Sequence, residues 1–580
     1  MAVRDKYDVV IMGAGLAGLS LCRQLLLNSR DKSILLIDNR AELPGSRQKV
    51  GESLVQVAGY YFTRVLDLEE HLLRDHYPKF NLRFHWKTHG RDNTDFRDYS
   101  FSYLGKSSNV ATYQLNRNKI EAHLLELALQ SPNVTLCTPV TELKVELAEG
   151  GSHLVRFKLD GNSEQTQAGW LVDTTGRSQI LKKRHDLGME SPIRHGSSWC
   201  WVEGLVNIEK LTDLTPGEIR KRRDLQKQGA FPIWLATTHF CGEGFWFWVI
   251  PLKGLTSLGV VYDKAVLSQE KVNTPEKLLK WACEEFPLFA RDFPHRKILD
   301  AAWFADFAYD CKQTISPAKW AVSGFAGRFS DPLYSPGSDL IAFYNTMITD
   351  AILTADPEAL KRKVELYEAL MKVVYDAYVP SYFMSYDTLG DQECFTFKYA
   401  WELAIYFAFY AFPFINDLFT NERFIKFYFR KFAQLGPVNR NLQKFLSDYY
   451  RWKKMLPPRD GPISNDYLDL SALKRIECSY YRIPPGVEDA EEELAGHLQL
   501  LKDFARYMYA YMTSVILGDR QVMFNRSYVN SIKLGLHTLD PESLRKGYQA
   551  HAGCTEICDW GMDAEAMERF RPSPVGELMP

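Results

Sequence analysis

Apolar runs near the start of the chain and helical spacing toward its end predict an α/β N-terminal part followed by a mainly helical part. Residues 8–12 form an apolar run typical of a buried strand, and a helix is expected from about Leu16. A second apolar run ends at Asp38 and predicts the next strand. From Pro357 onward, apolar residues recur at spacings of three and four, which is the pattern of amphipathic helices.

The segment 244–251, GFWFWVIP, alternates two sets of bulky side chains. Successive side chains of a strand point to opposite faces, so each set would occupy one face. The sets are Trp246, Trp248 and Ile250 on one face and Phe245, Phe247 and Val249 on the other. Because both sets are apolar, a strand buried on both faces is predicted.

The longest apolar run, residues 403–415, is short and contains Pro413. A helix needs about 20 apolar residues to cross a bilayer, so no membrane span is expected. A buried helix or an aromatic wall of a pocket is favoured instead. Its aromatic residues are expected to belong to the core, namely Tyr406, Phe407, Phe409 and Tyr410.

The composition of the chain argues against a nucleic-acid partner, a disulfide framework and a bound metal. The 580 residues include 70 Lys plus Arg and 72 Asp plus Glu, a formal net charge of −2. Nucleic-acid-binding proteins usually carry a basic surface, so no nucleic-acid partner is expected. The ten cysteines lack the dense spacing of a disulfide framework, which favours a cytoplasmic location. His551, Cys554 and Cys558 lie close together, but no second ligand pair follows, so no metal is expected.

Glycines between the first strand and the first helix carry the first chemical signal. Gly13, Gly15 and Gly18 have the G-x-G-x-x-G spacing in the strand-turn-helix context that gives this pattern meaning. The first glycine permits the turn, the second admits a pyrophosphate and the third allows close packing of helix and strand. Asp38 would accept hydrogen bonds from a ribose. A glycine-rich turn without ligand is the alternative, but the flanking elements favour a dinucleotide, either FAD or NAD.

Further segments resemble the flavin monooxygenases of the glutathione-reductase type. They contain, in chain order, Gln114 and Arg117 before a helix, Asp173 and Gly176 after a strand, and Asp331 and Gly337 before another helix. The resemblance implies that these residues contact FAD. The chain departs from the family at residues 323–325, Ser-Gly-Phe, where Gly-Asp-Ala is common. FAD is favoured over NAD because no second glycine fingerprint occurs in the sequence.

The order of the motifs is similar to that of the flavin-dependent halogenases. The motifs are KVGESLVQ at 49–56, YPKFNLRFHW at 77–86, WFWVIP at 246–251 and SDPLYSPG at 330–337. The W-x-W-x-I-P pattern is the most specific of them, whereas Gln56 stands where the family usually has proline. The resemblance covers roughly residues 5–350 and implies that Ser53 also contacts the flavin.

This resemblance implies a particular chemistry. Reduced FAD and O₂ would form a flavin hydroperoxide, which oxidises chloride or bromide to hypohalous acid. Lys79 matches the amine that captures this acid as a chloramine, or orients it by hydrogen bonding, for electrophilic halogenation. Aromatic neighbours would desolvate such a lysine and lower its pKa, and Lys49 is the rival amine. Halide contacts are expected around Ser335, Gly337 and Ser338, where a helix begins.

The motifs also bear on the substrate. A partition that passes small hypohalous acid but keeps the substrate from the flavin is expected from Trp246, Trp248, Ile250 and Pro251. Tyr334 stands where tryptophan halogenases carry glutamate, which favours a phenol, a pyrrole or an enolisable carbonyl compound. Free and carrier-tethered substrates both stay open, as does the role of the C-terminal helices. A separate flavin reductase is expected because no nicotinamide site is evident.

Together these patterns predict three domains. An FAD-binding Rossmann-like domain of the glutathione-reductase type is expected at 1–190, completed by 315–356, with a mixed α/β substrate-side subdomain at 191–314 and a mainly helical domain at 357–580. An FADH₂-dependent halogenase is the favoured function. A flavin hydroxylase of the same fold needs neither Lys79 nor the double tryptophan, and a desaturase or reductase is a further alternative. A non-enzymatic flavin-binding protein is the alternative from a different class.

Overall fold

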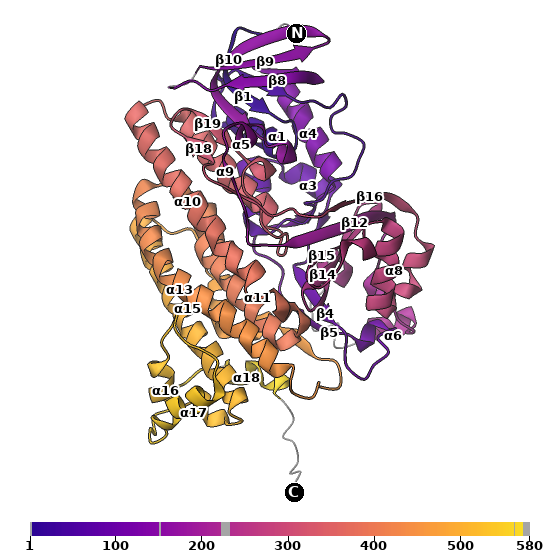
Figure 1. The fold of residues 1–580 in the computed structure, drawn as a ribbon, viewed down its shortest axis with the longest axis vertical. Helices are drawn as coiled ribbons and strands as arrows, with labels where there is room; N and C mark the ends of the chain where they lie inside the picture. The colour runs from indigo at the N-terminus through magenta and orange to yellow at the C-terminus, as the bar shows by residue number, and fades with distance from the viewer. Residues whose placement is uncertain (1–2, 150–151, 222–231, 562, 572–580) are drawn as a thin grey trace.

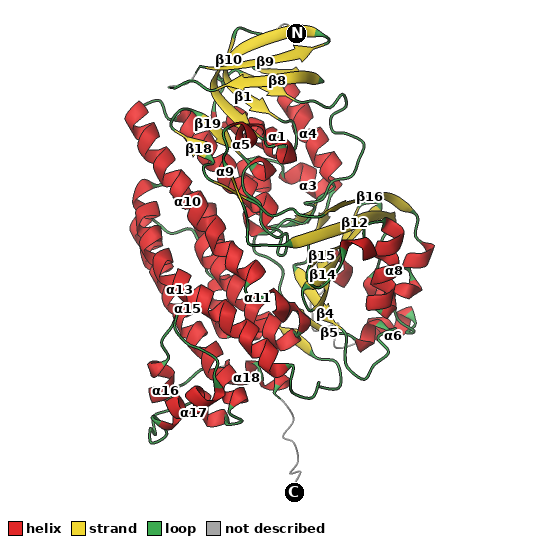
Figure 2. Ribbon diagram, viewed as in Figure 1, coloured by secondary structure: helices red, strands yellow, loops and turns green. Residues whose placement is uncertain are grey.

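A computed structural model describes residues 3–149, 152–221, 232–561 and 563–571. Figure 1 shows the N-terminal strands at the top, a second sheet to the right and long helices running down the left side. Figure 2 shows the same division by element type, with helices making up the lower left of the molecule. The predicted fold class is confirmed: an α/β part with a mixed sheet precedes a helical region.

The first sheet is mainly parallel, with the strand order β18-β19-β10-β1-β2-β7, and β9 and β8 continue from β10. Its bounds are β1 (Lys6–Met12), β2 (Ile34–Ile37), β7 (Val134–Cys137), β8 (Val140–Glu146), β9 (His153–Leu159), β10 (Asn162–Asp173), β18 (Ile315–Ser316) and β19 (Trp320–Val322). Side chains of β1 enter separate core clusters on the two faces, with Val9 and Ile11 in one and Val10 and Met12 in the other. This double burial explains the unbroken apolar run, which is typical of a parallel strand.

Helix α1 (Leu16–Asn28) follows β1, and α9 (Pro336–Leu353) is the next α-helix after β19. Helix α4 (Arg117–Leu129) follows the short strand β6 (Tyr113–Gln114) and leads into β7. Ligand sites in such sheets lie outside the carboxyl ends of the strands. Met12 of β1 and Asp173 of β10 are register partners at that edge, so the predicted glycine turn and the loop after Asp173 lie next to each other.

The second sheet has the strand order β16-β12-β15-β14-β13-β4-β5-β20. Its bounds are β4 (Leu82–Trp86), β5 (Ser100–Tyr103), β12 (His195–Glu203), β13 (Thr237–Gly242), β14 (Phe245–Leu252), β15 (Leu255–Asp263), β16 (Ile298–Phe304) and β20 (Ser464–Asp466). The double-tryptophan strand is β14, and its two faces enter different core clusters as predicted. The cluster shared with the first sheet takes Trp246, Trp248 and Ile250, and the other takes Phe247 and Val249.

The remaining N-terminal elements are short connections around the two sheets. They are α2 (Gln56–Tyr60), α3 (Glu69–Asp75), β3 (Tyr77–Pro78), β6 (Tyr113–Gln114), α5 (Ile180–Arg184), β11 (Gly188–Met189), α6 (Pro216–Lys221), α8 (Pro275–Glu285) and β17 (Asp310–Cys311). β3 pairs with β6, which brings the segment that leads to Lys79 against the one that leads to Arg117.

Long helices make up the C-terminal region. They are α10 (Pro357–Phe383), α11 (Gln392–Tyr406), α13 (Glu422–Lys453) and α15 (Val487–Ile516), with shorter α12 (Phe412–Ile415), α14 (Ser471–Glu477), α16 (Arg526–Ser531), α17 (Pro541–Gln549) and α18 (Asp563–Ala566). Side-chain oxygens of Asp356, Asp391 and Asn421 accept backbone hydrogen bonds at the starts of α10, α11 and α13. These caps satisfy N–H groups that a helix leaves unpaired, and they explain where the helices begin.

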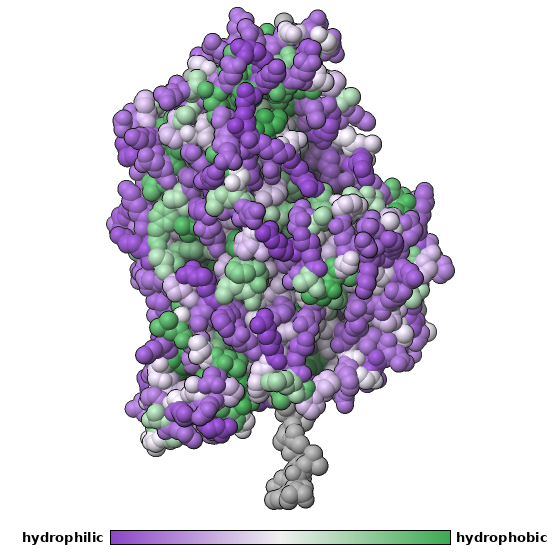
Figure 3. All heavy atoms as spheres, in the orientation of Figure 1, coloured by the Kyte–Doolittle hydropathy of each residue, from purple (hydrophilic) through white to green (hydrophobic). Residues whose placement is uncertain are grey.

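The face shown in Figure 3 is mostly hydrophilic, with hydrophobic patches over parts of the helical region. Among the described residues, no helix combines the length and the apolar character needed to cross a membrane.

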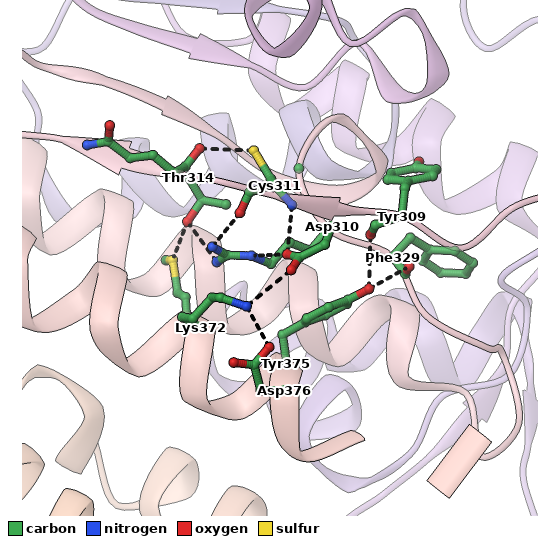
Figure 4. Close-up of polar contacts among 12 residues, drawn as sticks. Tyr309, Asp310, Cys311, Thr314, Phe329, Lys372, Tyr375 and Asp376 are labelled. Atoms are coloured by element: carbon green, nitrogen blue, oxygen red, sulfur yellow. Dashed lines mark hydrogen bonds and ion pairs between the residues drawn. The ribbon is translucent and has the colours of Figure 1, made fainter. Parts of the chain in front are cut away.

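A buried polar network docks α10 against the N-terminal region. Arg328 is fully buried, and its guanidinium pairs with Asp310 and with Glu368 of α10, each at 2.8 Å. Figure 4 shows Lys372 of α10 reaching Asp310 as well, while the Tyr375 hydroxyl donates to a backbone oxygen of the N-terminal region. Burying charges is costly unless they are paired. The network therefore favours the one position of α10 against the N-terminal region in which these charges are paired.

The network predicts unequal losses of stability for two of its cations. Arg328→Met removes the fully buried cation, but Asp310 keeps Lys372 and Glu368 keeps backbone donors, so a loss of about 3 kcal/mol, the low end for a broken buried pair, is expected. Lys372→Met removes a partner of the same Asp310, but its side chain is 37% exposed, so a loss below about 1 kcal/mol is expected. Thermal unfolding midpoints of the two variants and the wild type measure the difference. Equal shifts would show that the Arg328 pairs do not stabilise the docking.

Candidate functional site

The glycine turn after β1 has the geometry that a dinucleotide site requires. Gly13 has φ +103°, and a Cβ there would lie 2.5 Å from the Thr174 carbonyl oxygen. A Cβ on Gly18 would lie 2.0 Å from the Gly13 carbonyl oxygen, so both positions need glycine for packing. A Cβ on Gly15 would meet no described atom within 4 Å. Gly15 therefore faces open space at the start of α1, where a pyrophosphate would lie.

The predicted nucleotide-binding acids organise the loops beside this turn. Asp38 accepts a hydrogen bond from the Ala14 N–H at 2.8 Å and pairs with Arg40 at 2.9 Å. Asp173 accepts from the backbone N–H groups of Thr175 and Leu181. The turn then passes Gly176 at φ +61°. Direct contacts of these residues with a nucleotide stay predictions.

Two cavities lie side by side among the described residues. The small cavity has a volume of about 120 Å³ and the large cavity about 600 Å³. The small cavity is lined by many of the residues predicted around the flavin ring, namely Ser53, Arg117, Trp246, Trp248, Ile250, Ser335, Gly337 and Ser338. The structure thus brings together motifs that lie nearly 300 residues apart in the sequence.

Hydrogen bonds fix the loop that forms one side of the small cavity. The Ser53 hydroxyl and the Gln114 amide both bond to the Thr237 hydroxyl, at 2.8 and 2.9 Å. Arg117 donates to the Val50 carbonyl at 2.6 Å and pairs with Glu121. Gln114 therefore acts on this loop through Thr237, a residue that the sequence motifs did not indicate.

The rival amine, Lys49, lies outside the lining of both cavities as far as the described residues go. Its Nζ pairs with Glu121 at 2.5 Å, the carboxylate that also holds Arg117. This ion pair gives Lys49 a structural partner.

The turn before α9 supplies backbone donors to the small cavity. Tyr334 and Ser335 both have positive φ, at 68° and 62°. The Ser335 N–H donates to the Pro332 carbonyl at 2.8 Å, and Pro336 has no N–H. The donors left at the start of the helix are those of Gly337 and the residues after it, because the first helical N–H groups have no intrahelical acceptor. Halide binding at this turn stays a prediction.

Asp331 lies beneath this turn and is fully buried. Its Oδ2 lies 2.6 Å from His195 Nδ1, and the Tyr386 hydroxyl donates to it at 3.1 Å. Trp246 Nε1 in turn donates to the Tyr386 oxygen at 2.7 Å. Tyr386 follows α10, so the C-terminal region helps to hold the tryptophan strand and the turn. No local sequence pattern indicated the parts played by His195 and Tyr386.

Lys79 is buried at the edge of the large cavity, between β3 and β4. Its side chain is 7% exposed, and Nζ donates to the Leu54 carbonyl at 2.7 Å. Burial lowers the pKa of Lys79 to about 7, and the negative charge of Asp339 partly opposes this shift. Burial likewise raises the pKa of Asp339 to about 7. A neutral amine and an ammonium are therefore both accessible near neutral pH.

Short segments separate the two cavities. Ser53 lines the small cavity and the next residue, Leu54, lines the large one. The turn into α9 alternates in the same way, since Tyr334 and Pro336 line the large cavity and Ser335 lines the small one. The tryptophans of β14 line the small cavity, and Pro251 belongs to the lining of neither cavity among the described residues. That β14 separates the flavin from the substrate stays a prediction. In the structure, residues 53–54 and 334–336 lie between the two cavities.

The C-terminal helices form much of the large cavity, which sequence motifs did not indicate. Its lining from α10, α11 and the residues after α11 includes Tyr378, Tyr382, Tyr399, Glu402, Tyr406 and Tyr410. The expectation that the aromatic run is core holds for Phe407 and Phe409 but is incomplete for Tyr406 and Tyr410, which face the cavity. A π-helical turn at Phe407–Ala411 follows α11, and such turns are frequent at functional sites.

The sequence around Glu402 did contain a usable signal. Lys398 and Glu402 are a charged pair at i and i+4 within an otherwise apolar helix, FTFKYAWELAIYF. Charged residues are rarely buried unless they are paired or functional. His551, one of the three residues near the C-terminus at which no metal was expected, bonds to Ser527. Among the described residues no cluster of three His, Cys, Asp or Glu side chains could hold a metal ion.

Comparison with known proteins identifies relatives of this chain. Over 400 residues the chain is 28% identical to the flavin-dependent halogenase chlA of Dictyostelium discoideum, covering 64% of each protein. It is 26% identical to the 1H-pyrrole-2-carbonyl-[peptidyl-carrier protein] chlorinase of Pseudomonas fluorescens, covering 57% of this chain and 72% of the chlorinase. The chain is thus similar in sequence to flavin-dependent halogenases. The motif resemblance is thereby confirmed, although the match spans less than two thirds of chlA.

The fold of the chain agrees with that comparison. A crystal structure of halogenase PltM in complex with phloroglucinol and FAD matches with a TM-score of 0.58 and 15% identity, covering 86% of this chain and 96% of PltM. At this identity the match shows a shared fold. No protein-family model matches the chain.

Two glycines of the first turn predict opposite outcomes for the same substitution. Gly15→Ala should fold with an unchanged melting temperature, because its new methyl group meets open space, yet weaken FAD binding about tenfold or more. Gly18→Ala should lower the melting temperature, because its methyl group meets the Gly13 carbonyl. Titration of the two apoproteins with FAD and thermal unfolding without it check both. Unchanged FAD affinity in Gly15→Ala would contradict the site.

Proposed function

We propose that the chain is an FADH₂-dependent halogenase that acts on an electron-rich substrate through Lys79. The observation that carries the proposal is a buried lysine that lines a large cavity, separated by a wall of few residues from a small cavity built of halogenase motifs. The sequence relatives are named as a halogenase and a chlorinase, which supports halogenation as the reaction. Neither of these names supports the hydroxylase or the non-enzymatic alternative.

The residues present fit FAD. The turn at Gly13, Gly15 and Gly18 leaves room for a pyrophosphate, and the small cavity has an apolar, aromatic lining suited to a flat ring. When bound in reduced form, FAD with O₂ and chloride or bromide supplies hypohalous acid. The N–H groups of Gly337 and Ser338 would hold the halide, since a helix start binds anions. A separate flavin reductase would supply the reduced cofactor.

Lys79 would then act on the hypohalous acid in the large cavity. Its ammonium can donate a hydrogen bond to the acid, and its neutral amine can capture the halogen as a chloramine. A pKa of about 7 makes both forms available at neutral pH. The bond to the Leu54 carbonyl holds Nζ at the boundary between the cavities. The halogen would therefore reach the substrate on the side of the large cavity that is next to the small one.

The lining of the large cavity favours a phenol among electron-rich substrates. Several buried polar atoms that line it have no hydrogen-bond partner among the described residues, namely Tyr334 Oη, Asp339 Oδ2, Tyr378 Oη and Glu402 Oε2. Buried polar groups are nearly always paired, so a ligand with several hydroxyl groups suits this cavity. The relatives include a carrier-dependent chlorinase, and a carrier-tethered substrate would enter past Gly436, Pro437 and Arg440 of α13.

Replacement of Lys79 should separate halogenation from the rest of the reaction. Lys79→Met keeps the volume but removes the amine, so product formation should fall about 100-fold or more while FAD still binds. Lys49→Met tests the rival amine and should retain halogenation at saturating FAD. Product is measured by the halogen isotope pattern in mass spectrometry after reaction of a phenol panel with chloride or bromide. Retained halogenation in Lys79→Met would refute the lysine's role, and a hydroxylated product would favour the hydroxylase.

A further inference from the structure

A buried carboxylate from the C-terminal region faces the large cavity. The Glu402 side chain, on α11, is 8% exposed and lines this cavity. Its Oε1 accepts hydrogen bonds from Lys398 Nζ at 2.6 Å and Gln443 Nε2 at 2.9 Å. Its Oε2 is buried and has no hydrogen-bond partner among the described residues. One oxygen is thus held by the protein, and the other is left for a ligand.

A structural ion pair explains only half of this arrangement. Lys398 is fully buried and also donates to the Ser381 carbonyl at 2.7 Å and the Ser385 hydroxyl at 2.9 Å, so it has partners besides Glu402. A buried carboxylate with an open oxygen costs free energy that a neutral side chain of similar size avoids. The pair with Lys398 accounts for Oε1, whereas Oε2 makes no hydrogen bond of ordinary length among the described residues and can accept one from a substrate.

Glu402 and Tyr334 line the same cavity. The Tyr334 hydroxyl, from the turn that separates the cavities, faces the Glu402 carboxylate and makes no hydrogen bond of ordinary length among the described residues. Burial and then the charge of Glu402 raise the pKa of Tyr334 well above its usual value, so this phenol keeps its proton. Tyr334 cannot serve as the base, and the carboxylate beside it can.

We propose, on the basis of the halogenase function above, that Glu402 is the catalytic base that accepts the hydroxyl proton of a phenol substrate during halogen transfer. A phenolate is a far stronger carbon nucleophile than a phenol, so removal of this proton activates the ring carbon. Lys398 and Gln443 are positioning residues, because they hold Oε1 and leave Oε2 toward the substrate.

The proposed step balances in atoms and charge. The phenol O–H bond breaks, and its proton moves to Glu402 Oε2. The ring carbon then bonds to the halogen of hypohalous acid while the halogen–oxygen bond breaks, and the departing hydroxide takes a proton from the Lys79 ammonium to form water. The halogenated carbon loses its proton to the Lys79 amine, and Glu402 returns the first proton to the phenolate oxygen. Phenol and hypohalous acid thus give halophenol and water.

A series of phenols of graded acidity tests the role of Glu402 in the full-length, FAD-loaded enzyme. In Glu402→Gln, kcat for weakly acidic phenols should fall about 100-fold, with a smaller change in KM. The loss should shrink for more acidic phenols and vanish for those already ionised at the assay pH. The wild type should show little dependence on acidity. A loss of the same size for every phenol would overturn the proposal.

Matched controls separate the base from the structure around it. Glu393 is a buried carboxylate on the same helix, paired with Lys453 at 2.6 Å and outside the lining of the large cavity among the described residues. Glu393→Gln should behave like the wild type, with little dependence of kcat on the acidity of the phenol. An acidity-dependent loss like that expected for Glu402→Gln would overturn the proposal. Should Glu402→Gln fail to fold, the double variant Lys398→Met/Glu402→Gln removes both charges and should show the same dependence.

A further readout distinguishes failure of the inference from failure of the proposed function. If wild type halogenates none of the phenols and shows no halide-dependent consumption of O₂, the halogenase function itself fails. If it consumes O₂ in this way but halogenates no phenol, the phenol substrate and with it the role of Glu402 fail. If wild type halogenates the phenols and Glu402→Gln matches it for weakly acidic phenols, only the role of Glu402 fails. Halide-dependent consumption of O₂ without substrate should be equal in wild type and Glu402→Gln, because the carboxylate acts after hypohalous acid forms.

Discussion

The burial of one ammonium group organises the site. A charge removed from water costs several kcal/mol unless it is well hydrogen-bonded, and the Leu54 carbonyl meets part of that need for Lys79. That carbonyl belongs to the loop whose preceding residue, Ser53, bonds to Thr237 beside the small cavity. Any shift of the loop would therefore disturb the lysine on one side and the small cavity on the other. The two compartments share one short stretch of backbone.

The C-terminal helices extend this arrangement. Arg328 anchors α10 to the N-terminal region through two buried ion pairs, and α10 and α11 then line the large cavity. Tyr386, just after α10, bonds to Asp331 and accepts from Trp246. The helical region thus reaches the turn before α9 and the tryptophan strand, which are both parts of the halogenase motifs. It shapes the pocket, whatever further part it plays in docking a partner.

Local patterns predicted the parts of the site that depend on local geometry. The glycine turn, the start of α9 and the two faces of β14 all follow from spacing within a few residues, and the structure has them where they were expected. Partners far apart in the sequence were not predictable in this way. Asp331 pairs with His195 and Ser53 bonds to Thr237, so residues assigned to the cofactor have distant protein partners as well.

The large cavity was the least predictable part, for a physical reason. An aromatic residue buried against other side chains and one that borders a cavity have the same helical spacing, so Tyr410 and Phe409 look alike in sequence. Glu402 was different, because a charge within an apolar helix is a local anomaly. Its function depends on which oxygen the neighbours leave open, and that is a tertiary property.

The alternation of residues along the turn into α9 has a consequence for how new variants could arise. The small cavity, where the oxidant would form, and the large cavity, where the substrate would bind, are lined by alternate residues of this turn. Most residues that line the large cavity come after residue 357. Mutations in α10, α11 and α13 can therefore reshape what is accepted without altering the oxidising machinery. Substrate selectivity could therefore change while the small cavity stays the same.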